Sequence, residues 1–104
     1  MFKKKILIID DTEFMTKLIS DILTAADYDV VTASEGMQGI QKVREEKPDL
    51  VILDVVMPGM DGFEVCKMLR EDESNNLMPI IMLTARGDEK DELLGFELGV
   101  DEYI

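Results

Sequence analysis

Runs of consecutive apolar residues alternate along this chain with longer stretches in which apolar residues recur every three or four positions. Residues 6–9 (ILII) and 50–53 (LVIL) are apolar without a break. Unbroken runs of this kind are typical of strands that are covered on both faces in a parallel sheet. The pattern predicts strands over residues 5–9, 30–33, 50–53 and 79–83, with the start of a fifth strand at 103–104.

The stretches between these strands have the spacing of amphipathic helices. Over residues 13–26, Met15, Leu18 and Ile22 fall on one helical face, and Thr12 stands before them at the position of an N-cap. Further helices are predicted over residues 36–46, 63–71 and 90–98. Strands that alternate with helices in this way favour an α/β fold built on a doubly wound parallel sheet.

Acidic and hydroxyl side chains follow three of the predicted strands at the point where each ends. Asp10 and Asp11 follow the first strand, Asp54 the third and Thr84 the fourth. Acids at strand ends also cap turns and helices, so any one of these residues alone would mean little. Ligands of a doubly wound sheet bind outside the carboxyl ends of its strands, and we therefore expect the set to converge at one edge.

Three carboxylates at one edge of a sheet repel each other and call for a divalent cation between them. Hard oxygen ligands suit Mg²⁺, which commonly shares its coordination shell with a phosphate. We predict that Asp10 and Asp11 hold the ion and that Asp54, which follows a central strand alone, acts as a nucleophile toward phosphorus. Thr84 would then donate a hydrogen bond to a phosphoryl oxygen.

Composition and charge exclude several other functions. The length of 104 residues, 46% of them apolar, fits one domain. With 23 acidic residues against 11 basic ones, the formal charge of −12 argues against direct binding of nucleic acid or anionic membranes. Because no apolar run approaches the ~20 residues that cross a bilayer, we expect a soluble, cytoplasmic protein. A single cysteine and no histidine exclude an internal disulfide and a Ser-His-Asp triad.

Taken together, these motifs are similar to those of the response-regulator receiver domains of two-component signalling. The matching segments are residues 6–11 (ILIIDD), 53–54 (LD), 57–62 (MPGMDG), 83–85 (LTA) and 99–104 (GVDEYI). They cover nearly the whole chain in the order of the family. The resemblance implies a flavodoxin-like, CheY-like sheet with the strand order 2-1-3-4-5, in which the fifth strand and helix are mostly missing.

The resemblance also implies a role for each residue of the acidic set. Asp54 is the phosphoacceptor, to which a phosphohistidine donates its phosphoryl group. Asp10 and Asp11 bind Mg²⁺, for which Mn²⁺ can substitute. Asp54 and the backbone carbonyl of Val56 complete the protein ligands of the metal. Such a domain is modified on its own side chain and is not a turnover enzyme.

Two further positions match residues that change conformation in the family, and one helix matches its docking surface. Thr84 corresponds to the switch hydroxyl, and Tyr103 to the switch aromatic. The implied partner is a histidine kinase or a histidine phosphotransfer protein, which docks on the first helix around Phe14, Met15 and Leu18. A homodimer is compatible with this interpretation.

The chain departs from the family at its end. Receivers carry a Lys-Pro motif soon after the position of Tyr103, followed by a fifth helix, and this sequence contains neither. We therefore expect residues 1–104 to be a receiver domain that is incomplete at its C-terminus. The missing lysine leaves open the alternative of a degenerate or truncated receiver that acts as a non-phosphorylated protein-interaction module.

Two other classes of protein place an acid or a phosphate at similar strand ends. A phosphatase of the haloacid dehalogenase type needs a second acid two residues after its nucleophile, but Thr12 and Val56 stand at those positions. A flavodoxin-like electron carrier binds a flavin phosphate after its first strand, where Asp10 and Asp11 would repel it. The receiver hypothesis fits the residues better than either class does.

Overall fold

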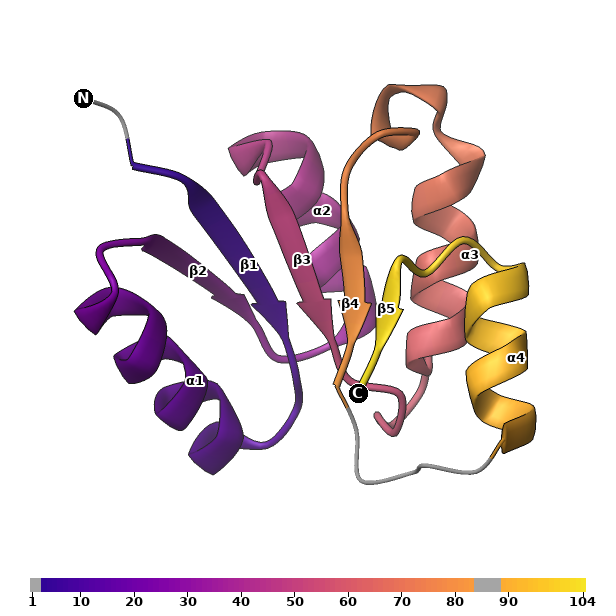
Figure 1. The fold of residues 1–104 in the computed structure, drawn as a ribbon, viewed down its shortest axis with the longest axis horizontal. Helices are drawn as coiled ribbons and strands as arrows, with labels where there is room; N and C mark the ends of the chain where they lie inside the picture. The colour runs from indigo at the N-terminus through magenta and orange to yellow at the C-terminus, as the bar shows by residue number, and fades with distance from the viewer. Residues whose placement is uncertain (1–2, 84–88) are drawn as a thin grey trace.

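Strands and α-helices alternate along the described chain (Figure 1). The computed structural model describes residues 3–83 and 89–104. In chain order the elements are β1 (Lys5–Ile9), α1 (Glu13–Ala25), β2 (Asp29–Ala33), α2 (Gly36–Glu46), β3 (Leu50–Leu53), α3 (Gly62–Glu71), the 3-10 helix η1 (Glu73–Asn75), β4 (Ile80–Met82), α4 (Glu89–Glu97) and β5 (Glu102–Tyr103). The predicted strands and α-helices are confirmed, with ends that shift by at most one residue. The short helix η1 was not predicted.

The strands form one parallel sheet with the order β2-β1-β3-β4-β5. Helix α1 packs against β1 and β2. Helix α2 contacts α3, and α3 contacts α4. Helix α2 lies behind the sheet in the view of Figure 1. The doubly wound fold and its strand order are therefore confirmed.

Side chains on the two faces of the sheet are covered to different extents. Leu7 and Ile9 are fully buried in the core between the sheet and helices α2 and α3. Side chains alternate between the faces along a strand, so Ile8 and its aligned neighbours Ile52 and Ile81 point to the face on which α1 packs. Ile52 and Ile81 are only half-buried, and α1 itself has no fully buried residue. The apolar interior of the domain therefore lies mainly on the α2–α3 side.

The single cysteine, Cys66, lies inside the core on α3. Its thiol donates a hydrogen bond to the carbonyl oxygen of Leu98 at 3.3 Å. Burial raises the pKa of the Cys66 thiol to about 11, which keeps it protonated at neutral pH. Since the thiolate is the reactive form, Cys66 is a packing residue here.

Helix length bears on whether the domain could cross a bilayer. The longest described helix, α1, has 13 residues, against the ~20 that span a membrane. Within residues 3–83 and 89–104, no helix is both long and apolar enough to do so.

Candidate functional site

The parallel pairing of β1 with β3 brings the predicted acids together. Ile9 and Leu53 are partners in the register of the two strands, and the amide of Asp54 donates a hydrogen bond to the carbonyl of Ile9 at 3.0 Å. The residues that follow these strands therefore emerge side by side at one edge of the sheet. One carboxylate oxygen from each of the three acids, Asp10, Asp11 and Asp54, lies within 4.8 Å of the others.

The three carboxylates differ in their exposure. Asp10 is buried with 8% of its surface exposed, Asp54 is half-buried and Asp11 is exposed. The Oδ1 atom of Asp10 accepts a hydrogen bond from the amide of Thr12 at 2.8 Å, which fixes the orientation of the buried carboxylate. A buried carboxylate beside two others is unfavourable unless a cation balances the charge.

The donor set fits Mg²⁺ in its chemistry. All three side chains offer carboxylate oxygens, the hard ligands that Mg²⁺ binds. One oxygen of each acid lies within 4.8 Å of the others, so a single ion between them could be held by all three side chains.

The first residue of α3, Gly62, packs closely against the backbone of Asp54. The Gly62 amide donates a hydrogen bond to the carbonyl of Val55 at 2.9 Å. A Cβ atom on Gly62 would overlap the carbonyl oxygen of Asp54 and lie 2.9 Å from the Cα of Val55. Asp61 caps the helix, since its Oδ1 accepts a hydrogen bond from the amide of Glu64 at 2.9 Å. Gly62 thus fixes the loop after β3, a role that the sequence analysis missed because Asp61-Gly62 has the form of an ordinary turn.

The acids form part of a pocket of about 650 Å³. Its lining consists of Asp10, Asp11, Thr12, Met15, Asp54, Val56 and Leu83. Met15 on α1, Val56 and Leu83 form the apolar part of the pocket wall. The Val56 side chain is 53% exposed at this wall. A pocket of this size admits a small charged group together with part of the molecule that carries it.

Tyr103, Phe14 and Leu18 are not among the residues that line the acidic pocket. Thr84 falls outside the described residues. Tyr103 lies half-buried on β5, with its ring packed against α4. On α1, Phe14 is 73% exposed and Leu18 is 44% exposed, whereas Met15 lines the acidic pocket.

Thr12 is the N-cap residue of α1, as predicted, but its side chain makes no capping hydrogen bond. The Thr12 amide instead donates to Asp10, and its carbonyl accepts from the amide and the hydroxyl of Thr16 at 3.0 Å each. Thr12 therefore helps to orient a site residue through its backbone.

Comparison with known proteins agrees with this geometry. The family model described as "Response regulator receiver domain" matches residues 6–104. The chain is 48% identical over 101 residues to the alkaline phosphatase synthesis transcriptional regulatory protein PhoP of Bacillus subtilis, covering 97% of this chain and 41% of that protein. It is 40% identical over 102 residues to the DNA-binding response regulator MtrA of Mycobacterium tuberculosis, covering 98% of this chain and 43% of MtrA. The chain thus spans about two-fifths of the length of these curated relatives.

Solved structures show the same likeness. The chemotaxis protein CheY4 of Vibrio cholerae superposes with a TM-score of 0.95 at 31% identity, covering 99% of this chain and 86% of that one. The BeF3-activated N-terminal receiver domain of RstA from Klebsiella pneumoniae gives a TM-score of 0.90 at 35% identity, covering 97% of this chain and 84% of that one.

Proposed function

Since the chain belongs to the response regulator receiver domain family, we propose that it accepts a phosphoryl group on the carboxylate of Asp54 and changes conformation in response. The observation that carries this proposal is the convergence of Asp10, Asp11 and Asp54 in one open pocket. The three acids would together balance a metal ion, and an oxygen of Asp54 would remain available as a nucleophile. The modified group is a side chain of the protein itself, so the domain is a signalling module and not a turnover enzyme.

The chemistry of the transfer follows from the arrangement of the acids. Asp10, Asp11, Asp54 and the backbone carbonyl of Val56 would hold Mg²⁺, or Mn²⁺ in its place. When bound, the ion offsets the negative charge of the incoming phosphoryl oxygens. An oxygen of Asp54 attacks phosphorus, the P–N bond of a phosphohistidine breaks, and the imidazole nitrogen leaves with the bonding electron pair and takes up a proton. The product is an aspartyl phosphate.

The surface around the pocket supports a protein as the phosphodonor. Phe14 and Leu18 present exposed apolar side chains on α1, and Met15 on the same helix lines the pocket. We propose that a histidine kinase or a histidine phosphotransfer protein docks there and brings its phosphohistidine to Asp54. A cytoplasmic location belongs to the same proposal, because the free thiol of Cys66 suits a reducing compartment.

Intact mass after incubation with Mg²⁺ and a small phosphodonor tests the proposal. The parent chain should gain the mass of one phosphoryl group, and Asp54→Ala should gain none because the nucleophile is gone. Asp21→Asn removes an exposed carboxylate on α1 and should label like the parent. A parent that binds Mg²⁺ but stays unmodified would contradict the proposal and favour the alternative of a non-phosphorylated interaction module.

The side chain of Val56 should set the lifetime of the aspartyl phosphate. It lines the pocket wall beside Asp54 and is apolar, so it cannot orient a water molecule for attack on phosphorus. Val56→Asn supplies an amide that can do so, and we expect it to shorten the half-life of the modified protein about tenfold. The half-life is followed by the decay of the phosphorylated mass after the donor is removed. Val56→Leu, which remains apolar, should decay like the parent, and an equal loss in both variants would refute the role of the amide.

A further inference from the structure

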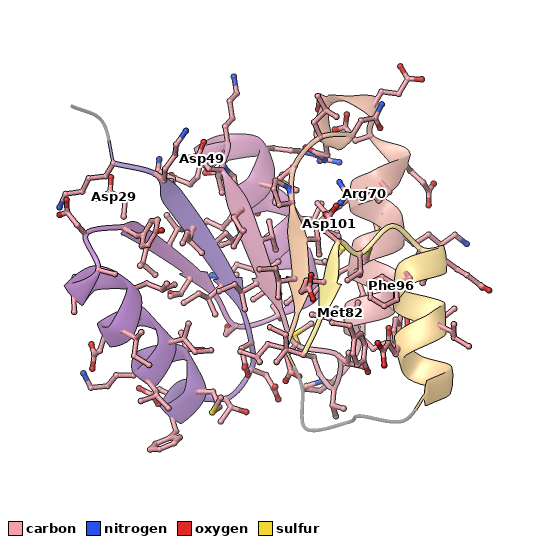
Figure 2. All side chains as sticks on the ribbon, viewed as in Figure 1. Asp29, Asp49, Arg70, Met82, Phe96 and Asp101 are labelled. Atoms are coloured by element: carbon pink, nitrogen blue, oxygen red, sulfur yellow. The ribbon has the colours of Figure 1, made fainter. Side chains whose placement is uncertain are left out.

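The side chain of Arg70, near the end of α3, joins two connections of the chain that are far apart in sequence. It donates four hydrogen bonds: from Nε to the carbonyl of Gly99 (2.9 Å), from Nη1 to the carbonyls of Asn75 (2.6 Å) and Met78 (2.8 Å), and from Nη2 to Oδ2 of Asp101 (2.9 Å). The side chain is only 17% exposed. Figure 2 shows Arg70 and Asp101 where α3 approaches β4 and β5. The guanidinium therefore ties the α3–β4 connection to the α4–β5 connection.

Asp101 connects Arg70 to strand β4 of the sheet. Its Oδ2 atom also accepts a hydrogen bond from the amide of Ile80 at 2.8 Å, and its own amide donates to the carbonyl of Ile80 at 2.9 Å. Asp101 thus forms hydrogen bonds with Ile80, the first residue of β4, through both its side chain and its backbone. Strand β5 has only 2 residues, so few other backbone hydrogen bonds fix its position. One of them is the bond from the amide of Ile104 to the carbonyl of Met82 at 2.7 Å.

The position of β5 determines where the ring of Tyr103 lies. Tyr103 is aligned with Met82 in the register of β4 and β5. A Cβ atom on Gly95 of α4 would lie 3.2 Å from Cδ2 of Tyr103, so the ring packs where α4 has no side chain. A shift of β5 along β4 would move the ring away from this place.

Helix α3 connects this network to the acidic site. Its first residue, Gly62, touches the backbone of Asp54, and Arg70 is the ninth of its 10 residues. A helix of this length is rigid and spans about 15 Å. The network around Arg70 therefore lies at the opposite end of α3 from the pocket, and a substitution there leaves the carboxylates themselves unchanged.

We propose that Arg70 and Asp101 are positioning residues that hold β5 in register beside β4 and so place the ring of Tyr103 against α4. Arginine is suited to this role because its planar guanidinium reaches several acceptors at once, which a lysine ammonium on a flexible stem does not. The meaning of this placement for signalling rests on the proposed function, in which Tyr103 responds to phosphorylation. The placement itself does not depend on it.

Amide hydrogen exchange in the unmodified protein tests the placement. In Arg70→Lys and in Asp101→Asn, the amides of Asp101 and Ile104 should exchange about tenfold faster than in the parent, because charge-assisted hydrogen bonds are lost. Amides of β1 and β3 should keep their parental rates. Asp21→Asn, which removes an exposed ion pair with Lys17, is the matched control and should change neither group. Unchanged exchange in the variants, or equal acceleration across all strands, would overturn the proposal.

Tyrosine fluorescence tests the link to Tyr103. The chain has 2 tyrosines and no tryptophan, so Tyr28→Phe leaves Tyr103 as the single emitter. In this background, Mg²⁺ and a small phosphodonor should change the emission of the parent. Arg70→Lys should take up the phosphoryl group to the same extent but lose most of that change. A full emission change in Arg70→Lys would overturn the role in positioning Tyr103.

The two measurements separate this proposal from the proposed function. If the parent takes up no phosphoryl group, the proposed function fails, and the exchange rates still decide whether Arg70 and Asp101 hold β5. If uptake is normal and the exchange rates are unchanged, the proposed function stands and the positioning role fails.

Discussion

Replacing Gly62 by alanine should lower the free energy of unfolding by about 3 kcal/mol or more. The new Cβ atom would overlap the carbonyl oxygen of Asp54 and lie 2.9 Å from the Cα of Val55. Both are backbone atoms, which cannot rotate away as the end of a flexible side chain can. Relief requires α3 to move away from the loop after β3, which also displaces Asp54. Urea denaturation followed by circular dichroism measures the loss of stability.

Gly59→Ala is the matched control for this change. Gly59 lies in the same loop with a φ of +80°, and a Cβ atom there would meet nothing within 4 Å. Its replacement costs only the strain of a left-handed backbone, about 1 kcal/mol. If Gly62→Ala proved as mild as Gly59→Ala, the close approach of α3 to Asp54 would be wrong.

Replacing Asp10 by asparagine should change stability and metal binding in opposite directions. Asparagine keeps an oxygen that can accept the hydrogen bond from the Thr12 amide but removes one of three neighbouring negative charges. Without divalent cations, the free energy of unfolding should therefore rise by about 1 kcal/mol. The affinity for Mg²⁺ should fall at least about tenfold, because a charged hard ligand is replaced by a neutral one.

Thermal unfolding with and without Mg²⁺ measures both effects. A cation that binds only the folded state raises the melting temperature as its concentration rises. We expect this rise in the parent and in Asp21→Asn, and little of it in Asp10→Asn at the same Mg²⁺ concentration. An equal rise in Asp10→Asn would show that the ion binds elsewhere.

Most of the fold could be predicted because its signals are local. The apolar run of β1 and the helical spacing of α1 each lie within one element. The meeting of Asp10 and Asp54 also followed from the sequence, since the ends of neighbouring parallel strands lie at the same edge of a sheet. No exact distance was needed for that prediction.

The residues that sequence analysis missed act through contacts between distant segments. Arg70 and Asp101 are 31 positions apart, and their hydrogen bond depends on how α3 packs beside the α4–β5 connection. The pattern of apolar and polar positions along the chain does not indicate that Arg70 and Asp101 lie close together. The close contact of Gly62 with Asp54 is similar, because a glycine after an aspartate predicts a turn but not which atoms lie against it.

The unequal exposure of the three acids has a consequence for the timing of metal binding. Asp11 faces solvent while Asp10 is buried, so a cation can enter or leave from the Asp11 side without any unfolding of the chain. Under the proposed function, occupancy of the site would then follow the free concentration of Mg²⁺ around the protein. If Asp54 is modified as proposed, its readiness for modification would change with the ionic surroundings of the protein.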